Sequence, residues 1–428
     1  MSKLCVLVLA VAMIANYSSA LNCGDGKIRG VNLGGWLVLE PWITPTIFEE
    51  VNVELGGQVV DEYTYAQYVD PDFASDRLNR HWDEFYTRAD LVKLVDAGIS
   101  HLRIPVGYWL VDVSPDEFFP PPPATDDDGQ RFYLKRLAGW CEELGLKILI
   151  DLHCGPGSQN GFDNSGQRGE INWFNPDDHS NIDRTLVILE KISVMMKSWI
   201  DDGTMSPDTL FGIAILNEPW GIWEELWLEL RDHFHYNAYD VVRNVLGDGP
   251  KVVIQQAFRT PTDFHGYMAE GFENVMLDLH EYHAFGEYWN NLAEDNAGWS
   301  TNIDTSCGFK TVMTESTMDV VVGEWSLANQ DCQKYLDGGY DTPYHPPNGS
   351  PDTCAYYNKD FSEYTDDHKG FLRNFMAAQM DSYEAGDGYF FWTAKSEDNC
   401  APAWDFLFLL EQGIAPQNLC ERPRICTN

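Results

Sequence analysis

Residues 131–152 read RFYLKRLAGWCEELGLKILIDL and contain the unit from which the whole fold can be predicted. Apolar residues at helical spacing predict a helix over residues 131–144, and Gly145 stands where a helix commonly ends in a left-handed residue. The apolar, β-branched run 147–152 follows at once and predicts a buried strand. A helix that leads directly into a buried strand is the repeating unit of parallel α/β folds.

The same unit recurs in both directions along the chain. Residues 83–97 predict a helix that ends at Gly98, and further helices are expected over residues 223–246 and 368–385. Short apolar runs predict eight strands, at residues 28–33, 101–105, 147–152, 211–216, 252–256, 275–279, 320–323 and 388–392. Strands that alternate with helices in this way predict an α/β fold of the (β/α)8, or TIM, barrel type, in one domain with long strand-to-helix loops.

The composition of the 428-residue chain narrows the partners that it can bind. It has 67 acidic and 28 basic residues and a formal net charge of −39, which would repel a phosphate backbone or an anionic membrane. We therefore expect no nucleic acid and no membrane as partners. Aromatic residues make up 13% of the chain, which suits either the stacking of sugar rings or a core rich in large rings.

The first twenty residues are typical of a secretory signal peptide. Lys3 precedes a short apolar run, and Ser18-Ser19-Ala20 is a small-residue cleavage pattern. We expect cleavage after Ala20, a catalytic domain over residues 21–428, and a secreted protein located outside the cell or in the cell wall. Nine cysteines remain after cleavage, so several should pair in an oxidising compartment and at least one cannot pair within the chain.

Polar residues gather where the predicted strands end, which is where barrel enzymes build their active sites. They include Asn32, Glu40, Arg103, Asp151, His153, Asn217, Glu218, His280, Tyr282, Glu324 and Trp392. A single buried glutamate at a strand end is as well explained by a structural salt bridge. So many polar ends in one barrel are hard to explain by packing, because unpaired buried polar groups are costly.

Glu218 and Glu324 follow the fourth and the seventh predicted strands and can face each other across the barrel mouth. Cleavage of a glycosidic bond needs one acid that protonates the leaving oxygen and one carboxylate that attacks or activates water. A separation of about 5 Å would make the second carboxylate a nucleophile. Arg103 would keep one glutamate ionised, and His280 and Tyr282 would orient or protonate the pair.

Three short stretches of the chain resemble metal-binding or nucleophile motifs only in part. His280-Glu281-Tyr282-His283 is one residue shorter than the zinc motif HExxH and ends a strand instead of lying on a helix. Residues 126–129 lack the ligand spacing of a calcium loop, and residues 157–161 are not a GxSxG nucleophile turn. We therefore expect neither a metal nor a cofactor.

From residue 29 to residue 417 the chain resembles glycoside hydrolase family five, and within it the fungal-type exo-1,3-β-glucanases. The resemblance is carried by RGVNLGGWLVLEPWITPTIFE (29–49), RIPVGYW (103–109), GPGSQNGFDNSG (155–166), LNEP (216–219), GEWS (323–326) and APAW (401–404). It implies a retaining glycosidase in which Glu218 is the general acid/base and Glu324 is the nucleophile. Cys154 and Trp42 depart from the residues usual in this subgroup, which leaves the preference among glucans open.

The resemblance also assigns the surrounding residues. Arg103, His153, Asn217, His280, Tyr282 and Trp392 match the active-site set, Glu40 matches a residue that binds the terminal sugar, and Phe162 and Phe285 match an aromatic pair at the pocket entrance. It further implies that Cys332 pairs with Cys354, and Cys307 with Cys426 in preference to Cys420.

Three functions therefore remain open from the sequence. The chain is expected to be a monomeric exo-1,3-β-glucanase that binds β-glucan polysaccharides or oligosaccharides. A related β-glucosidase acting on 1,6-β-glucan or a glucosylated lipid is the first alternative. A glucan-binding protein without activity is the second, and the presence of both glutamates argues against it.

Overall fold

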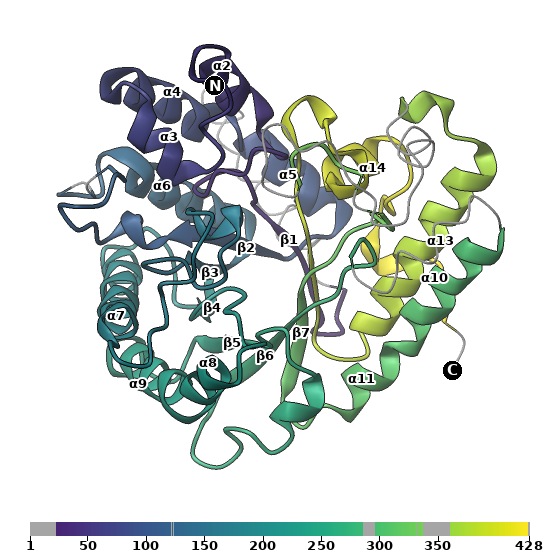
Figure 1. The fold of residues 1–428 in the computed structure, drawn as a ribbon. Helices are drawn as coiled ribbons and strands as arrows, with labels where there is room; N and C mark the ends of the chain where they lie inside the picture. The colour runs from purple at the N-terminus through teal and green to yellow at the C-terminus, as the bar shows by residue number, and fades with distance from the viewer. Residues whose placement is uncertain are drawn as a thin grey trace, which may run out of the picture.

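Eight parallel strands close into a barrel, and neighbouring strands follow the order of the chain. The computed structural model describes residues 23–120, 122, 124–285, 296–330, 332–336 and 360–426. The strands are β1 (Ile28–Asn32), β2 (His101–Gly107), β3 (Lys147–Cys154), β4 (Leu210–Ala214), β5 (Lys251–Gln255), β6 (Val275–His280), β7 (Asp319–Glu324) and β8 (Gly388–Phe391). Helices surround this ring (Figure 1), so the predicted (β/α)8 barrel is confirmed. The expected signal peptide, the loop 337–357 and Cys354 lie outside the described residues.

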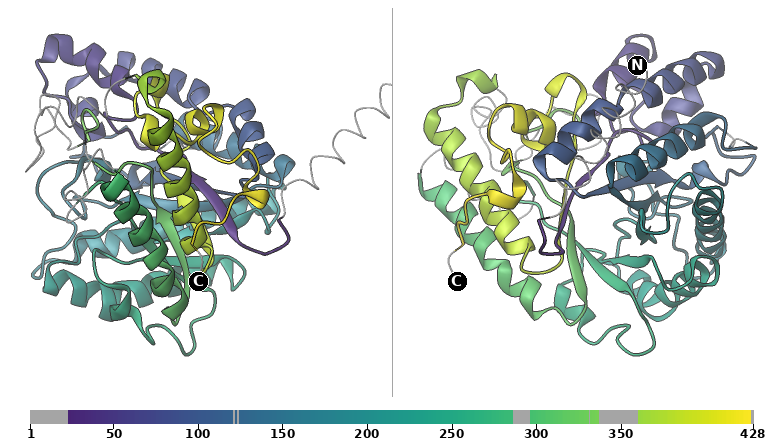
Figure 2. Two further views of the ribbon diagram at one scale, coloured as in Figure 1. Left: turned by 90° about the vertical axis from the view of Figure 1, so that its right-hand side faces the viewer. Right: turned by 180° about the vertical axis from the view of Figure 1, so that it is seen from behind.

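The helices cover most of the outer face of the barrel, as the opposite views in Figures 1 and 2 show. They are α2 (Pro45–Leu55), α3 (Glu62–Tyr68), α4 (Pro71–Glu84), α5 (Arg88–Ala97), α6 (Gly129–Leu144), α7 (Ser180–Asp201), α8 (Glu224–Glu229), α9 (His235–Leu246), α10 (Asn296–Gly308), α11 (Lys310–Glu315), α13 (Asp366–Tyr383) and α14 (Phe406–Glu411). The predicted helix 223–246 is present as α8 and α9, joined by a π-helical turn at Leu230–Phe234. In the part of the chain that the structure describes, no helix is long and apolar enough to cross a membrane.

The prediction of a single helix over residues 83–97 is wrong. Helix α4 ends at Glu84 and α5 begins at Arg88, with Thr87 between them as an extended N-cap. The Thr87 side chain accepts from the amide of Asp90, and the Asp90 carboxylate accepts from the amide of Thr87. This reciprocal capping box starts a new helix, and it overrides an apolar pattern that continues across the break.

The expected alternation of strands and helices also fails at one place. Between β5 and β6 the described chain forms only the 3₁₀ turn Pro261–Phe264 and no α-helix. The N-terminal part of the chain deviates in the opposite way, with more helices than one between two strands. Four helices lie between β1 and β2, namely α2, α3, α4 and α5. The barrel is therefore complete in its strands but uneven in its outer layer.

Inside the barrel, apolar side chains form a layer near the amino ends of the strands, which we call the floor. It consists of Ile28, Leu149, Ala214, Val253, Met276, Val321 and Phe390. Their neighbours in sequence, such as Ile148, Ile150, Val320 and Val322, belong to the larger core between the strands and the helices. This alternation follows from the two-residue period of a strand.

Two disulfides tie the C-terminal segment to distant parts of the barrel. Cys307 on α10 pairs with Cys426, which confirms that prediction, and Cys23 pairs with Cys420, which was not predicted. Cys332 is also disulfide-bonded. Cys141, Cys154 and Cys400 are free thiols. Crosslinks of this kind are typical of oxidising compartments.

Candidate active site

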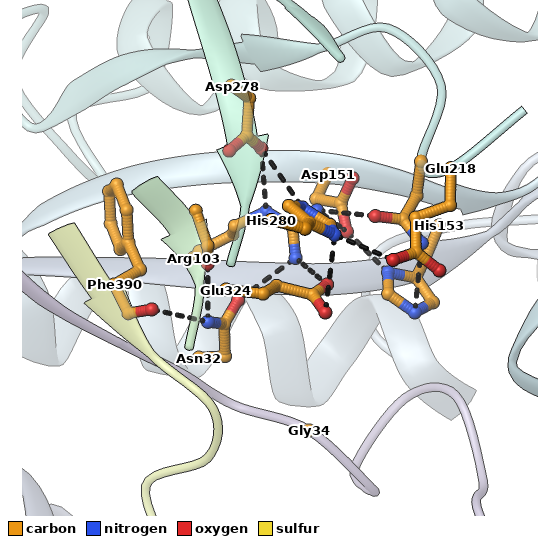
Figure 3. A network of polar contacts seen from close by, with 12 residues as sticks. Asn32, Gly34, Arg103, Asp151, His153, Glu218, Asp278, His280, Glu324 and Phe390 are labelled. Atoms are coloured by element: carbon orange, nitrogen blue, oxygen red, sulfur yellow. Dashed lines mark hydrogen bonds and ion pairs between the residues drawn. The ribbon is translucent and has the colours of Figure 1, made fainter. Parts of the chain in front are cut away.

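The polar residues predicted at the strand ends meet above the floor, at the carboxyl end of the barrel (Figure 3). The structure brings together Arg103 from β2, His153 from β3, Asn217 and Glu218 after β4, His280 and Tyr282 at the end of β6, and Glu324 at the end of β7. Eight strand ends converge on one mouth, so residues far apart in sequence become neighbours.

Glu218 and Glu324 are both buried, and the structure brings one carboxylate oxygen of each close to the other. These oxygens and one nitrogen of His280 all lie within 4.8 Å of one another. Carboxyl groups at about this separation are found in glycosidases that retain the anomeric configuration, whereas inverting enzymes keep their carboxyl groups farther apart.

A local irregularity between β6 and β7 helps to bring Glu324 into the mouth. Leu279 pairs with Val322, but His280 pairs with Glu324, so the register shifts by one residue at the end of the two strands. Such a bulge changes the direction of a side chain relative to a regular strand. Glu324 consequently reaches Arg103 and Tyr282, both of which donate hydrogen bonds to it.

Arg103 is fully buried and connects the two halves of the site. Its Nη1 donates to Glu324 at 2.9 Å and to Asn32 at 3.0 Å, and its Nη2 donates to the side-chain oxygen of Asn217 at 2.7 Å. Its Nη2 also lies 3.1 Å from Asp151. Burial raises the pKa of Asp151, and the charges of Arg103 and His153 overcome this and keep that pKa below its ordinary value. The guanidinium group thus fixes the orientation of Glu324 and compensates the buried negative charge.

His280 lies between the two glutamates. Its Nδ1 is 2.8 Å from Glu218 and 3.4 Å from Glu324. Burial lowers the pKa of His280, but the carboxylates of Glu324 and Asp278 raise it to about 10, so the imidazole is protonated at neutral pH.

The two glutamates respond to this cation in different ways. Burial raises the pKa of Glu218, and the hydrogen bond from His280 more than offsets that effect and lowers the pKa. Burial also raises the pKa of Glu324, and there it exceeds the opposing effects of His280 and Arg103. In the free site the shared proton therefore resides on the imidazole, one hydrogen bond away from Glu218.

The loop after β3 holds Glu218 in place, and its key residue, Gln159, was missed from the sequence. The amide nitrogen of Gln159 donates to the carbonyl oxygens of His153 and Asn217, so it joins the ends of β3 and β4. Asn164 from the same loop donates to Glu218 at 3.3 Å, and the thiol of Cys154 donates to the carbonyl of Asn164. Glu218 has a φ of 42°, an uncommon conformation that needs such support.

Glu40 is buried, and it lies close enough to Glu218 and Glu324 for their charges to raise its pKa. It is 4% exposed, accepts a hydrogen bond from the indole of Trp42 at 3.0 Å, and has a pKa well above its ordinary value because of burial and the charge of Asp163. Burial likewise raises the pKa of Asp163 to about 7. One carboxylate oxygen of Asp163 has no hydrogen-bond partner among the described residues, which suits an acceptor for a ligand hydroxyl. Asp163 was not singled out in the sequence, although it lies inside the GFDNSG stretch.

Aromatic rings line the rest of the mouth. Trp392 stacks on His153 with ring centroids 5.4 Å apart, and Trp404 contacts both Trp42 and Tyr282. Phe162 and Phe285 are partly exposed, as an entrance pair requires, but they belong to different groups of rings. Phe285 contacts Tyr282 and Trp404.

Phe162 is one of three neighbouring rings that form a second aromatic group. It contacts Trp220 at 5.6 Å and Phe258 at 6.3 Å between centroids, and Trp220 contacts Phe258 at 5.2 Å. Phe162 and Phe258 are 40% and 37% exposed, so their faces are available to a ligand. Neither Trp220 nor Phe258 was expected from the sequence, because an aromatic residue in a loop carries no sign of what it will contact.

His283, the last residue of the HEYH motif, does not share the site of His280. It is buried, lies 3.2 Å from the hydroxyl of Ser306 on α10, and packs edge-on against Phe375 on α13. The motif therefore does not combine its two histidines in one set of ligands.

Comparisons with known proteins show which family the chain is similar to. The family model described as Cellulase (glycosyl hydrolase family 5) matches residues 67–343. The chain is 37% identical over 93% of its length to the probable glucan 1,3-beta-glucosidase A of Aspergillus fumigatus, of which it covers 89%. It is 35% identical over 97% of its length to the glucan 1,3-beta-glucosidase of Blumeria graminis, of which it covers 92%.

Solved structures show the same fold. The rutinosidase from Aspergillus niger matches with a TM-score of 0.65 at 20% identity, over 91% of this chain and 97% of that one. AoRut matches with a TM-score of 0.69 at 20% identity and the same coverage. From the family model and the two relatives we conclude that this chain belongs to glycosyl hydrolase family 5 and is a glycoside hydrolase.

Proposed function

We propose that the chain is a secreted, retaining exo-1,3-β-glucanase that releases glucose from the non-reducing ends of β-1,3-glucan. The observation that carries the mechanism is the approach of the Glu218 and Glu324 oxygens to within 4.8 Å, too close for a water to attack between them with inversion. The substrate is inferred from relatives that are named glucan 1,3-beta-glucosidases.

In the first step Glu324 attacks the anomeric carbon and forms a glucosyl-enzyme, while Glu218 protonates the leaving oxygen. Arg103 and the Tyr282 hydroxyl donate to Glu324 and orient it, as a nucleophile needs. Glu218 needs its proton in this step, and His280 lies 2.8 Å away with a proton to give.

In the second step Glu218, now a carboxylate, removes a proton from water, and the water displaces Glu324 from the sugar. Two displacements restore the original anomeric configuration, so the released glucose is the β-anomer. The Trp392 ring stacked on His153 would form one wall for the sugar held in this step.

The exo action is inferred from two buried carboxyl groups, Glu40 and Asp163, of which Glu40 is electrostatically coupled to Glu218 and Glu324. They can bind hydroxyls that only a terminal sugar presents. The rings of Phe162, Trp220 and Phe258 would support the next sugars of the chain on the leaving-group side.

Secretion is proposed from the N-terminal pattern of residues 1–20, and the disulfides Cys23–Cys420 and Cys307–Cys426 support it. N-terminal sequencing of the exported protein should begin at Leu21. A product that retains Met1 inside the cell would contradict export.

Product analysis on three substrates tests the proposed activity. Laminarin, a 1,6-β-glucan and a glucosylated lipid are incubated separately with the enzyme and with the Glu324→Gln variant as a blank. We expect glucose as the first product, with laminarin the fastest substrate. Faster turnover of either other substrate would reassign the specificity, early oligosaccharides would exclude exo action, and binding without turnover would indicate a glucan-binding protein.

A further inference from the structure

Asp278 is a charged group inside the barrel that takes no part in the steps proposed above. It lies on β6 two residues before His280, so both side chains point into the barrel, and it is 1% exposed. His280 Nε2 lies 3.5 Å from its Oδ2, and Arg103 Nε lies 3.7 Å from the same oxygen (Figure 3). Neither oxygen of Asp278, and neither of those nitrogens, has a hydrogen-bond partner among the described residues. A buried carboxylate in this situation acts mainly through its charge on the two cations.

The neighbouring strand fixes the position of this carboxylate. Gly323 on β7 precedes Glu324, and a Cβ atom at Gly323 would overlap the carboxylate of Asp278. The glycine of the GEW motif therefore leaves the space that Asp278 occupies. A side chain there would displace Asp278 and, with it, the charge beside His280.

The two nitrogens of His280 consequently face different groups. Nδ1 faces the catalytic pair, at 2.8 Å from Glu218 and 3.4 Å from Glu324, whereas Nε2 faces Asp278. A carboxylate beside one ring nitrogen stabilises the proton on that nitrogen and selects the tautomer. Loss of a proton from His280 should therefore occur at Nδ1.

We propose that Asp278 is a positioning residue that keeps a proton on Nε2 of His280, so that Nδ1 is the nitrogen that exchanges a proton with Glu218. Before reaction, His280 carries protons on both nitrogens and Glu218 is a carboxylate. Transfer of the Nδ1 proton along the hydrogen bond breaks one N–H bond and forms one O–H bond, leaving a neutral imidazole with its proton on Nε2 and Glu218 as a carboxylic acid. The pKa of about 10 at His280, to which Asp278 contributes, agrees with this arrangement.

The other titratable and charged groups near His280 come from other strands. They are Glu218 after β4, Glu324 on β7, Arg103 on β2, and Asp151 and His153 on β3. Among the described residues that the structure places against His280, Asp278 is the carboxylate on the Nε2 side. The proposal rests on the proposed function only in taking Glu218 as the acid/base.

The tautomer of His280 can be read in the unaltered enzyme by long-range 15N–1H NMR of protein labelled at histidine, with His280→Gln used to assign the signal. We expect both nitrogens protonated at neutral pH, and a neutral form at higher pH that keeps its proton on Nε2. A neutral ring with the proton on Nδ1, or a ring still doubly protonated above the pH at which activity is lost, would overturn the proposal.

Kinetic measurements on Asp278→Asn give a second test. The readouts are the pH profile and the ratio between two substrates, which a merely structural role would not change. For an alkyl β-glucoside, whose leaving group needs protonation, kcat/KM at neutral pH should fall by about tenfold or more. The alkaline limb of its pH profile should move to lower pH by about one to three units. For dinitrophenyl β-glucoside, which leaves without a proton, kcat/KM should stay within about threefold of the unaltered enzyme.

Asp405→Asn is the matched control, because Asp405 is an equally buried aspartate whose carboxylate caps α14 and accepts hydrogen bonds from Ser396 and Phe408, not from Arg103, His280 or the two glutamates. It should change stability and leave the ratio between the two substrates unchanged. An equal fall for both substrates in Asp278→Asn would overturn the proposal, as would an unmoved alkaline limb. If the unaltered enzyme turned over neither glucoside, the proposed function would fail, while the NMR experiment would still decide the tautomer.

Discussion

The floor of the barrel and the charged layer above it are built from the same strands. On β3 the inward positions are Leu149 in the floor and Asp151 above it, and on β6 they are Met276 and Asp278. Two residues farther along, His280 contacts Glu218, and His153 lies 3.4 Å from the side-chain amide of Asn217, the residue before Glu218. Because inward-facing side chains recur at every second residue of a strand, a floor residue and a residue of the site lie within the same five residues of chain.

The two layers differ in what their burial does for stability. The floor removes apolar surface from water and stabilises the fold. The charged layer buries several carboxylates with Arg103, and such groups often contribute little net stability, although removal of one partner is costly. We infer that the upper layer exists for catalysis and the lower layer for folding, and the following experiments separate the two.

The largest contrast should come from two variants on the same strand, β7. Glu324→Gln should reduce kcat/KM on laminarin on the order of 10⁴-fold, because the nucleophile is lost. Its melting temperature should change little, because a glutamine oxygen can still accept from Arg103 and Arg103 keeps Asp151 as an ionic partner. Val321→Ala in the floor should do the opposite, with a loss of roughly 1–3 kcal/mol in the free energy of unfolding and nearly unchanged kcat. If both variants lowered stability and activity together, the separation of the two layers would be refuted.

Glu218→Gln sharpens the assignment within the charged layer. It should reduce kcat/KM about 10²–10⁴-fold for a poor leaving group, and much less for dinitrophenyl β-glucoside, because only the former needs an acid. Added azide should restore turnover and yield β-glucosyl azide, since azide needs no base. Near-native rates on laminarin, or the absence of any azide product, would contradict the acid/base role.

A smaller effect is expected for the aromatic residues at the outer rim of the mouth, because they would contact the substrate and take no part in bond cleavage. Phe162→Ala should weaken the contribution of the second and later sugars to binding by about 1 kcal/mol, or about fivefold in KM for oligosaccharides. Trp220→Ala should add to this if the three-ring group acts as one surface, and Phe285→Ala tests the other side of the entrance. The comparison substrate is a β-glucoside with a single sugar, whose KM should change less; an equal change for both would show that the rings are structural.

The pH dependence of stability should reveal a buried carboxyl group that has no cation paired with it. Asp151 differs from such a group, because Arg103 keeps it ionised. Glu62 is buried, accepts from the amide of Leu39, and has a pKa raised to about 8 by burial. Its ordinary value is 4.5, so the folded state binds its proton more tightly, and the stability from this proton is lost as pH rises from about 4.5 through about 8. The melting temperature of Glu62→Gln should therefore rise relative to that of the unaltered protein between pH 5 and pH 8. A constant difference between the two melting temperatures would contradict this assignment.

The sequence was sufficient for the strands and for the gathering of polar residues at their ends, because apolar runs that end in polar residues are local patterns. All eight predicted strands overlap the observed ones, and the residues at their ends converge as expected. The break at Thr87 was missed, although its T-x-x-D capping box is visible in the sequence.

Other features could not be read locally. Asp278 looks like an ordinary polar residue within a strand, and its relation to Gly323 arises only when β6 and β7 pair. Gln159 acts through two carbonyl groups that belong to different strand ends, and the grouping of Phe162 with Trp220 and Phe258 depends on three loops. These contacts are set by tertiary structure, so no single stretch of sequence encodes them.

The most direct test of the account is the anomer of glucose that is released first. Proton NMR recorded during the first minutes of laminarin hydrolysis, before mutarotation, separates the α and β anomeric signals. Two displacements at the closely spaced pair Glu218 and Glu324 predict that β-glucose appears first and α-glucose only later. α-Glucose as the initial product would mean a single displacement by water and would contradict the central claim that Glu324 is a nucleophile.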